Sequence, residues 1–271
     1  MTPTLAHALH LLLIGGGLVA AMMFFLWLIH LAIRNAGIVD AGWSLGLIVM
    51  AGVAVVNASP TASTGRTVGL LGMVTLWAMR LALHIVIRME SGPEDARYAQ
   101  LRSEWKTLIP LKFLGFFELQ ALLDVLLSLP FFAVALDPSP KVYPLCYAGI
   151  AVWFVAVLGE TTADTQLARF KRKAENKGKV CRVGLWNYSR HPNYFFEWLI
   201  WVAWALFALP SPFGYVGLIG PALMFYFLFR VTGIPATEAQ ALRSRGDAYR
   251  EYQQTTSAFV PMPHKKLPGE S

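Results

Sequence analysis

A polar stretch at the mouth of an apolar segment offers the clearest chemistry in this sequence. Residues 184–194 read GLWNYSRHPNY, and Glu197 follows inside the apolar run. Ionisable groups at bilayer depth are rare and are usually functional. Pro192 suits the first turn of a helix, where its missing N–H costs nothing, and Arg190 comes just before it. Because free helix N–H groups and an arginine both attract negative charge, the stretch predicts a site for an anionic ligand.

The same stretch has a second interpretation. An arginine anchored to lipid headgroups, with tyrosine and tryptophan as an aromatic belt, would account for its cation and its aromatic residues. If a helix begins near His191, however, Asn193 or Tyr194 and then Glu197 project along one side of it. The amide of Asn193 and the carboxylate of Glu197 would point into the membrane, and an aromatic belt does not explain them.

Two carboxylates end another apolar segment. Glu160 and Asp164 are four residues apart, so they share one face of a helix. Such a pair repels unless a cation or a hydrogen-bond donor is supplied. Either a basic residue of the adjoining loop pairs with them structurally, or they bind hydroxyl or amide groups of a ligand beneath that loop.

A third polar group begins near the end of the last apolar segment and continues beyond it. Arg230 lies near its end, and Pro235 then interrupts the helix. A broken helix at membrane depth is tolerated only where protein or a cavity satisfies its backbone. With Glu238 and Tyr249 beyond the break, we expect a third wall around the same site.

Charged groups also recur in or near the apolar segments of the N-terminal half. An ion pair between Asp40 and Arg80 could simply hold two spans together. Alternatively, these groups line a cavity and polarise or protonate a substrate, with His84 and Tyr98 as the proton donors. The charged groups in question are Asp40, Arg80, His84, Glu118 and Asp124.

The elements that must position these residues are membrane helices. Of the 271 residues, 56% are hydrophobic and 14% are charged, whereas soluble domains carry about a quarter charged residues. A spanning helix needs roughly 20 mostly apolar residues. The sequence therefore predicts an all-α polytopic membrane protein with seven spans. These are residues 8–33, 37–57, 67–88, 113–136, 142–163, 192–209 and 213–233.

The basic residues predict the orientation of these spans. With the N-terminus outside, 19 of the 23 Lys and Arg residues fall on the inner side and only two outside. The positive-inside rule thus favours a cytosolic C-terminus. We expect a bacterial inner-membrane protein whose net charge of +7 reflects topology and not nucleic-acid binding. Residues 94–108 and 237–252 are expected to be surface helices, lying on the membrane interface or covering a ligand.

The inner side of the C-terminal half collects cations, helix N-termini and hydrogen-bonding groups. This combination suits a polyanionic cofactor such as NADPH, which carries a pyrophosphate and a 2′-phosphate. No G-x-G-x-x-G follows a strand, so a Rossmann fold is not expected. Cys146 and Cys181 provide neither a disulfide framework nor metal-ligand spacing, and no metal site is expected.

At these residues the chain resembles the steroid 5α-reductase family, in the bacterial branch called DUF1295. The resemblance covers most of the chain. The R-H-P-x-Y element alone is not specific, because isoprenylcysteine carboxyl methyltransferases also carry it. The matching motifs are IVDAGW at 38–43, WAMRL at 77–81, ETTADTQL at 160–167, GLW at 184–186, SRHPNY at 189–194, and GIP at 233–235 with Glu238.

The resemblance implies seven helices, with NADPH bound among the C-terminal ones from the cytosolic side. It also implies hydride transfer to the β-carbon of an α,β-unsaturated ketone. We expect one membrane domain, with substrate-side helices over 1–136 and cofactor-binding helices over 137–271. The expected catalytic residues are Asp40, Arg80, His84 and Tyr98. The expected cofactor-binding residues are Glu160, Asp164, Lys171, Trp186, Arg190, His191, Asn193, Tyr194, Glu197, Arg230, Glu238 and Tyr249.

The chain departs from the family pattern on the substrate side. The eukaryotic reductases grip a 3-keto group with a Gln-Glu pair on the second span and a Tyr on the third. Here the second span offers Asp40 and Trp43, and the third offers Arg80 and His84. Glu160 also stands where the steroid reductases tend to have Asn. The expected substrate is therefore a lipophilic enone in general, steroid-like or isoprenoid.

Two other functions compete with the reductase. One is a membrane methyltransferase using S-adenosylmethionine, favoured by R-H-P-x-Y and by Glu238 followed by Tyr249 and Tyr252. That cofactor has no phosphate and so has less need of a basic loop. The other is a lipophile-binding or scaffold membrane protein, which would leave Asp164 and Glu197 without ligands.

Overall fold

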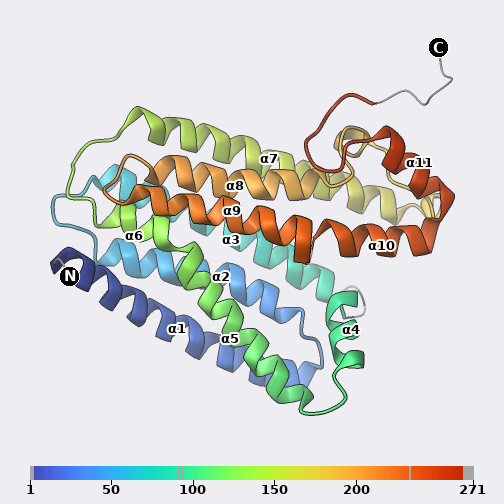
Figure 1. Cartoon of the computed structure of the whole chain (residues 1–271), viewed down its shortest axis with the longest axis horizontal. Coiled ribbons are helices and arrows are strands. Elements are labelled where there is room, and N and C mark those ends of the chain that lie inside the picture. Colours follow the sequence, from blue (N-terminus) through green and yellow to red (C-terminus); the bar gives the residue numbers. More distant parts are fainter. Residues whose placement is uncertain (1–2, 91, 93, 232, 265–271) are drawn as a thin grey trace. The chain divides into compact units, whose positions relative to one another are not determined.

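Helices make up most of the part of the protein that the structure describes. In the computed structural model (Figure 1), no residue of that part belongs to a strand, and one isolated bridge joins Ser189 to Ser257. The all-α prediction is therefore confirmed at this level. The described residues are 3–90, 92, 94–231 and 233–264.

Six helical segments of the described chain are long and apolar enough to cross a membrane. The sixth span expected from sequence corresponds to a shorter helix, α8 (Pro192–Ala208). Its 17 residues extend about 26 Å at 1.5 Å per residue, less than the roughly 30 Å of a hydrocarbon core. The six candidate spans are Leu5–Ile33, Ile38–Val56, Thr64–Glu90, Ile109–Ala135, Pro144–Arg172 and Gly214–Arg245, the last with residue 232 outside the description.

The chain divides into two compact units. Unit 1 comprises Met1–Cys146 and Ala208–Gly217, and unit 2 comprises Tyr147–Phe207 and Leu218–Ser271. The functional division at residue 136 stays a prediction.

Unit 1 is built around α2, which packs against α1, α3, α5 and α6. Large apolar side chains such as Met50, Trp77 and Phe117 are fully buried in it. The expected span at 113–136 is two helices, because α5 ends at Leu127 and α6 begins at Leu129 with a proline in its first turn. The helices of unit 1 are α1 (Pro3–Ile33), α2 (Ile38–Val56), α3 (Thr64–Glu90), α4 (Ala96–Glu104), α5 (Ile109–Leu127) and α6 (Leu129–Ala135).

A buried ion pair ties three segments of unit 1 together. Arg66, near the start of α3, donates from Nη1 to Asp137 Oδ2 at 2.6 Å. Its Nη2 donates to Ser211 Oγ at 2.5 Å, and its guanidinium lies 5.0 Å from the Tyr143 ring centroid. Because both charged side chains are almost fully buried, losing either partner would leave an uncompensated charge.

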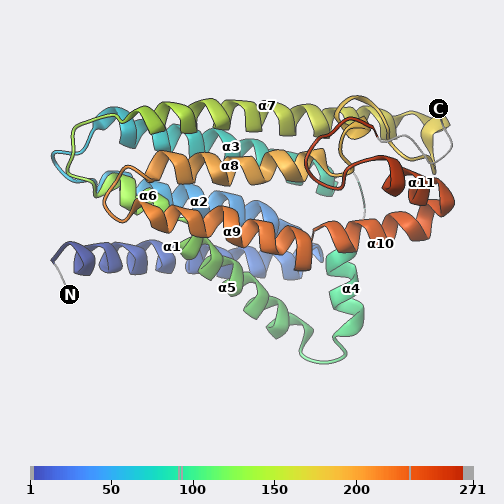
Figure 2. The ribbon, with the colours of Figure 1, turned by 45° about the horizontal axis from the view of Figure 1, so that its top comes forward.

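In unit 2 the long helix α7 lies beside α8 (Figure 1), and the two helices run roughly parallel in the turned view as well (Figure 2). Glycines allow this close approach. A Cβ on Gly149 would lie 2.8 Å from the Ala203 carbonyl oxygen, and one on Gly159 would overlap the Phe196 ring. The further elements are α7 (Pro144–Arg172), α9 (Ile219–Tyr226), a π-helical turn (Phe227–Val231), α10 (Ile234–Arg245), α11 (Asp247–Thr255), and 3₁₀ turns at Ala174–Asn176, Gly184–Asn187 and, mainly in unit 1, Gly214–Leu218.

Helices are present in both regions expected to form surface helices, with shorter or divided bounds, and their place at the membrane surface stays a prediction. The first is α4, where the Asp95 side chain caps the helix by accepting from the Arg97 N–H. The second is two helices, α10 and α11. They are separated at Gly246, whose φ of +54° suits glycine.

Candidate functional site

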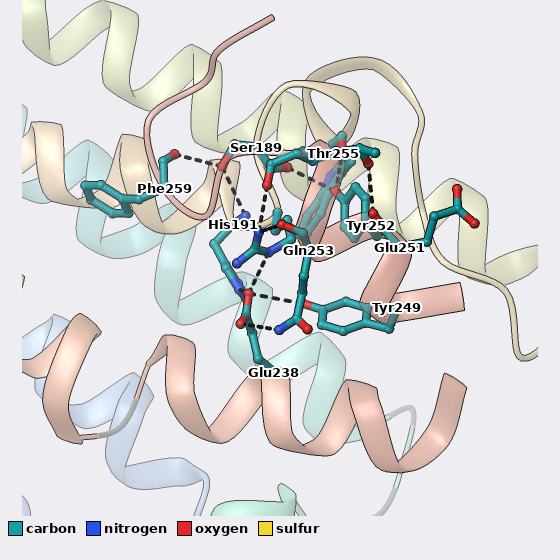
Figure 3. Close-up of polar contacts among 12 residues, drawn as sticks. Ser189, His191, Glu238, Tyr249, Glu251, Tyr252, Gln253, Thr255 and Phe259 are labelled. Atoms are coloured by element: carbon teal, nitrogen blue, oxygen red, sulfur yellow. Dashed lines mark hydrogen bonds and ion pairs between the residues drawn. The ribbon is translucent and has the colours of Figure 1, made fainter. Parts of the chain in front are cut away.

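A hydrogen-bonded cluster in unit 2 joins the segment before α8 to α10 and α11 (Figure 3). Its centre is the Glu238 carboxylate on α10. Oε1 accepts from Arg190 Nε at 2.7 Å and lies 3.2 Å from His191 Nε2. Oε2 accepts from Gln253 Nε2 at 2.7 Å, and the Tyr249 hydroxyl is 3.5 Å from Oε1. The structure thus brings together four of the residues expected to bind a cofactor.

Arg190 also fastens the chain that follows α11. Its Nη1 donates to the carbonyl oxygens of Gln253 at 2.9 Å and Thr256 at 2.6 Å, and its backbone N–H donates to Ser257. The side chain is only 10% exposed. Nε and Nη1 are therefore engaged within the protein, and Arg190 acts here as a positioning group. Its expected contact with a phosphate stays a prediction.

Aromatic residues extend this cluster on two sides. The rings of His191 and Tyr194 are stacked 5.3 Å apart, and the Tyr194 hydroxyl lies 3.2 Å from Thr237 Oγ1. Burial, followed by the negative charge of Glu238, raises the pKa of Tyr249. Tyr249 therefore stays protonated and able to donate at neutral pH.

Trp186 connects the cluster to α7. Its indole Nε1 donates to the Ala163 carbonyl at 2.9 Å, and its own carbonyl accepts from the Tyr252 hydroxyl. Nearby, Gln166 on α7 accepts from the Leu185 N–H at 2.9 Å. The segment from Gly184 to Asn187 is thus held against α7 immediately beside Asp164.

The second polar group of unit 2 lies on α7 and α8. Asn193 Nδ2 donates to Asp164 Oδ1 at 3.3 Å, and both side chains are partly exposed. Glu160, one turn earlier on α7, is buried at 4% exposure. Lys171 is exposed seven residues beyond Asp164 and so falls on the same helix face. This face therefore runs from two carboxylates to a cation.

The remaining cofactor candidates lie apart from these contacts. Glu197 accepts from Trp201 Nε1 at 3.3 Å within α8. Arg230 is exposed in the π-helical turn, and it forms no hydrogen bond or ion pair with another described residue. Such turns inside helices are frequent at functional sites.

In unit 1 the expected catalytic residues form two groups on three helices, with Asp40 of α2 beside Tyr98 of α4, and Arg80 and His84 on α3. Tyr98 on α4 donates to Asp40 Oδ1 at 2.5 Å, and Arg97 Nη2 donates to Asp40 Oδ2 at 2.9 Å. Burial raises the pKa of the Tyr98 phenol, and the charge of Asp40 raises it further. Arg80 and His84 are partly buried one turn apart on α3.

Several contributing residues were not anticipated from the sequence. Arg97 binds both Asp40 and the cap residue Asp95, and Gln253 binds Glu238. A signal was present for Gln253, because it is four residues from Tyr249 and directly follows the helix predicted over 237–252. The described residues hold no group of three or more His, Cys, Asp or Glu side chains placed to share a metal ion.

Comparison with known proteins gives one result. A family model described as "Protein of unknown function (DUF1295)" matches residues 26–256, which include every expected site residue. No curated protein and no solved structure matched the chain. The match spans most of the sequence and both units. The chain therefore belongs to the DUF1295 family.

Proposed function

We propose that this chain is a membrane reductase that uses NADPH to reduce the C=C bond of a lipophilic α,β-unsaturated ketone, steroid-like or isoprenoid. The motifs shared with the steroid 5α-reductase family support this proposal. The structural observation that carries it is the hydrogen bond between Asp164 and Asn193, with Lys171 farther along the same face of α7. An amide, a carboxylate and a cation in this order suit a cofactor with polar groups at one end and phosphates at the other.

The length of α7 supports the same assignment. Its 29 residues extend about 44 Å, well beyond a hydrocarbon core of roughly 30 Å, so its basic end would project into water. Lys171 is about 10 Å along the axis from Asp164. A ligand held at Asp164 and Asn193 would then lie near the membrane surface with its anionic part outward.

We assign the phosphates to the cations at the end of α7 and in the loop after it. These side chains are exposed, and Lys173 also pairs with the exposed Glu175 at 3.7 Å, whereas Arg190 is only 10% exposed and is bonded to Glu238 and to two carbonyl groups. When bound, NADPH would supply the hydride that the β-carbon of the enone receives. The exposed cations are Arg169, Lys171, Arg172, Lys173, Lys177 and Lys179.

On the substrate side, we assign the acid role to Tyr98 or His84. Asp40 accepts from the Arg97 guanidinium and from Tyr98, so it acts as a carboxylate that holds the phenol. The phenol or the imidazole would donate a hydrogen bond to the enone oxygen, and one proton would complete the reduction at the α-carbon. Arg80 would stabilise negative charge on the oxygen.

The proposal includes the topology expected from the sequence. If α8 is a short span in addition to the six longer ones, the chain crosses the membrane seven times. The N-terminus then lies outside a bacterial inner membrane and the C-terminus inside. The basic end of α7 then faces the cytoplasm, in agreement with the positive-inside rule.

A methyltransferase using S-adenosylmethionine is the second candidate. The observation favouring it is that Arg190 and His191 of the R-H-P-x-Y element contact Glu238 and lie near Tyr249. The exposed cations weigh against it, because this cofactor has no phosphate for them to bind.

Oxidation of NADPH by the purified protein tests the proposal. We expect absorbance of the reduced nicotinamide to fall when a panel of steroidal and isoprenoid enones is added. Asn193→Ala should raise KM for NADPH at least tenfold. Asn57→Ala, which removes an amide at the end of α2 in unit 1, should leave it unchanged. Methyl transfer from S-adenosylmethionine, with no NADPH oxidation, would overturn the proposal.

A further inference from the structure

Asp124 is a fully buried carboxyl in the interior of unit 1. It lies on α5, which packs against α1 and α2, and its exposed fraction is 0%. Its Oδ2 occupies the space beside Gly46 on α2, where a Cβ would overlap it, and Val19 on α1 borders the same place. Gly46 and Val19 lie near the middle of their spans, so the carboxyl is at the depth of the bilayer interior.

Neither carboxyl oxygen of Asp124 has a hydrogen-bond partner among the described residues. This sets it apart from the other aspartates, four of which pair with an arginine and one with an amide. Those are Asp40 with Arg97, Asp95 with Arg97 and Arg88, Asp137 with Arg66, Asp247 with Arg250, and Asp164 with Asn193.

The helices packed against α5 bring no cation to Asp124. On α1, His30 packs on the rings of Phe113 and Phe117 near the other end of α5. On α2, Asp40 is the only titratable group and is held by α4. The titratable side chains of α1, α2, α5 and α6 are His7, His10, His30, Asp40, Lys112, Glu118 and Asp124, with none on α6.

A buried carboxylate without a partner is unfavourable by several kcal/mol even after relaxation. A neutral acid in the same place forgoes only hydrogen bonds, which costs about 1–3 kcal/mol. Metal cations would need several ligands, and no group of three or more His, Cys, Asp or Glu side chains that could share one occurs among the described residues. A proton is the one cation that a single carboxyl can bind alone.

We propose that Asp124 is a proton-binding site in the interior of unit 1, occupied at neutral pH, and that its proton is coupled to the packing of α1, α2 and α5. Loss of the proton would place a charge against Gly46 and Val19, and the three helices would have to separate or admit water. The proposal is independent of the proposed reductase activity, since it concerns a side chain with no role in that reaction.

Infrared spectroscopy of the full-length protein in lipid nanodiscs tests this proposal. At pH 7 we expect the C=O stretching band of a protonated carboxylic acid, which shifts when the sample is prepared in D₂O. Asp124→Asn should remove this band and leave the carboxylate bands unchanged. The matched control Asp40→Asn, in the same unit, should retain the acid band and lose carboxylate intensity.

Two outcomes for Asp124→Asn would contradict the proposal. If Asp124→Asn leaves the acid band intact, or removes carboxylate intensity instead, Asp124 is ionised and the proposal is wrong. If that variant does not fold, wild-type protein labelled with ¹³C at the aspartate carboxyls decides the matter. A label-dependent shift of the acid band supports the proposal, and its absence overturns it.

Discussion

Arg190 donates from Nε to Glu238 Oε1 over 2.7 Å, although 48 positions separate them in the sequence. The bond joins the segment before α8 to the second turn of α10. Because the same guanidinium also donates to the carbonyl oxygens of Gln253, near the end of α11, and Thr256, just after it, one side chain fixes the relative positions of three segments of unit 2.

Replacing Arg190 by lysine should destabilise unit 2 strongly. Lysine keeps the charge but cannot donate at once to Glu238 and to two carbonyl oxygens. With the two side chains only 10% and 15% exposed, we expect a loss of about 3 kcal/mol, seen as a lower Tm in detergent. Arg250→Lys is the control, since its pair with Asp247 is exposed and should contribute nothing measurable. Equal Tm values for the two variants would contradict this account.

The close packing of α7 against α8 should make this contact sensitive to an added methyl group. Gly149→Ala would bring a methyl group to 2.8 Å from the Ala203 carbonyl oxygen, and backbone cannot move aside as a side chain can. We expect a loss of about 1–3 kcal/mol in thermal unfolding. Gly69→Ala on α3 meets no atom within 4 Å and should be neutral or stabilising, because alanine favours helices. A destabilised Gly69→Ala with an unaffected Gly149→Ala would refute the assignment.

Alkaline pH should weaken the fold through three buried phenols. Burial is the first cause that raises the pKa of Tyr98, Tyr249 and Tyr252. The contribution of these phenols to the free energy of unfolding is fully present below the unfolded pKa of about 10. It is lost as pH rises toward their higher pKa values in the folded protein. Tm should therefore fall above about pH 10, and Tyr98→Phe should reduce the slope. A slope unchanged in Tyr98→Phe would contradict the contribution of this residue.

Acid should release the segment that carries α4. Burial alone would raise the pKa of Glu94 and Asp95, but bonds from Arg102 and from Arg97, respectively, outweigh burial and lower both. The stabilisation from these two carboxylates is therefore fully present above their unfolded pKa values, near 4.5 and 3.8. It is lost as pH falls through their lower pKa values in the folded protein. Proteolysis between α3 and α5 should increase below about pH 4 in the wild type. In Glu94→Gln it should already be raised at pH 7.

Helix positions were largely predictable because their signals are local. An apolar run and Pro192 marked the start of α8, and the break expected at Pro235 falls in the first turn of α10. The proximity of Arg190 to Glu238 was expected from topology, which put both on one side of the membrane. Their direct bond was not, because 48 positions separate the two residues and only the tertiary structure brings the segment before α8 to α10.

The partner of Asp40 illustrates the other limit. Sequence reasoning offered Arg80, since charges within apolar spans tend to pair with each other. The structure gives Asp40 the partners Arg97 and Tyr98 instead. These come from α4, a polar helix whose side chains reach the start of α2 only after the chain has folded back. Such a contact is set by tertiary structure and leaves no trace in spacing.

Stabilisation of the detergent-purified protein by cofactors tests the central claim most directly. We expect NADPH to raise Tm by several degrees, NADH to raise it less, and S-adenosylmethionine to have no effect. Asn193→Ala and Asp164→Asn should abolish the shift without lowering the Tm of the free protein as Arg190→Lys does. A shift with S-adenosylmethionine and none with NADPH would contradict the reductase assignment.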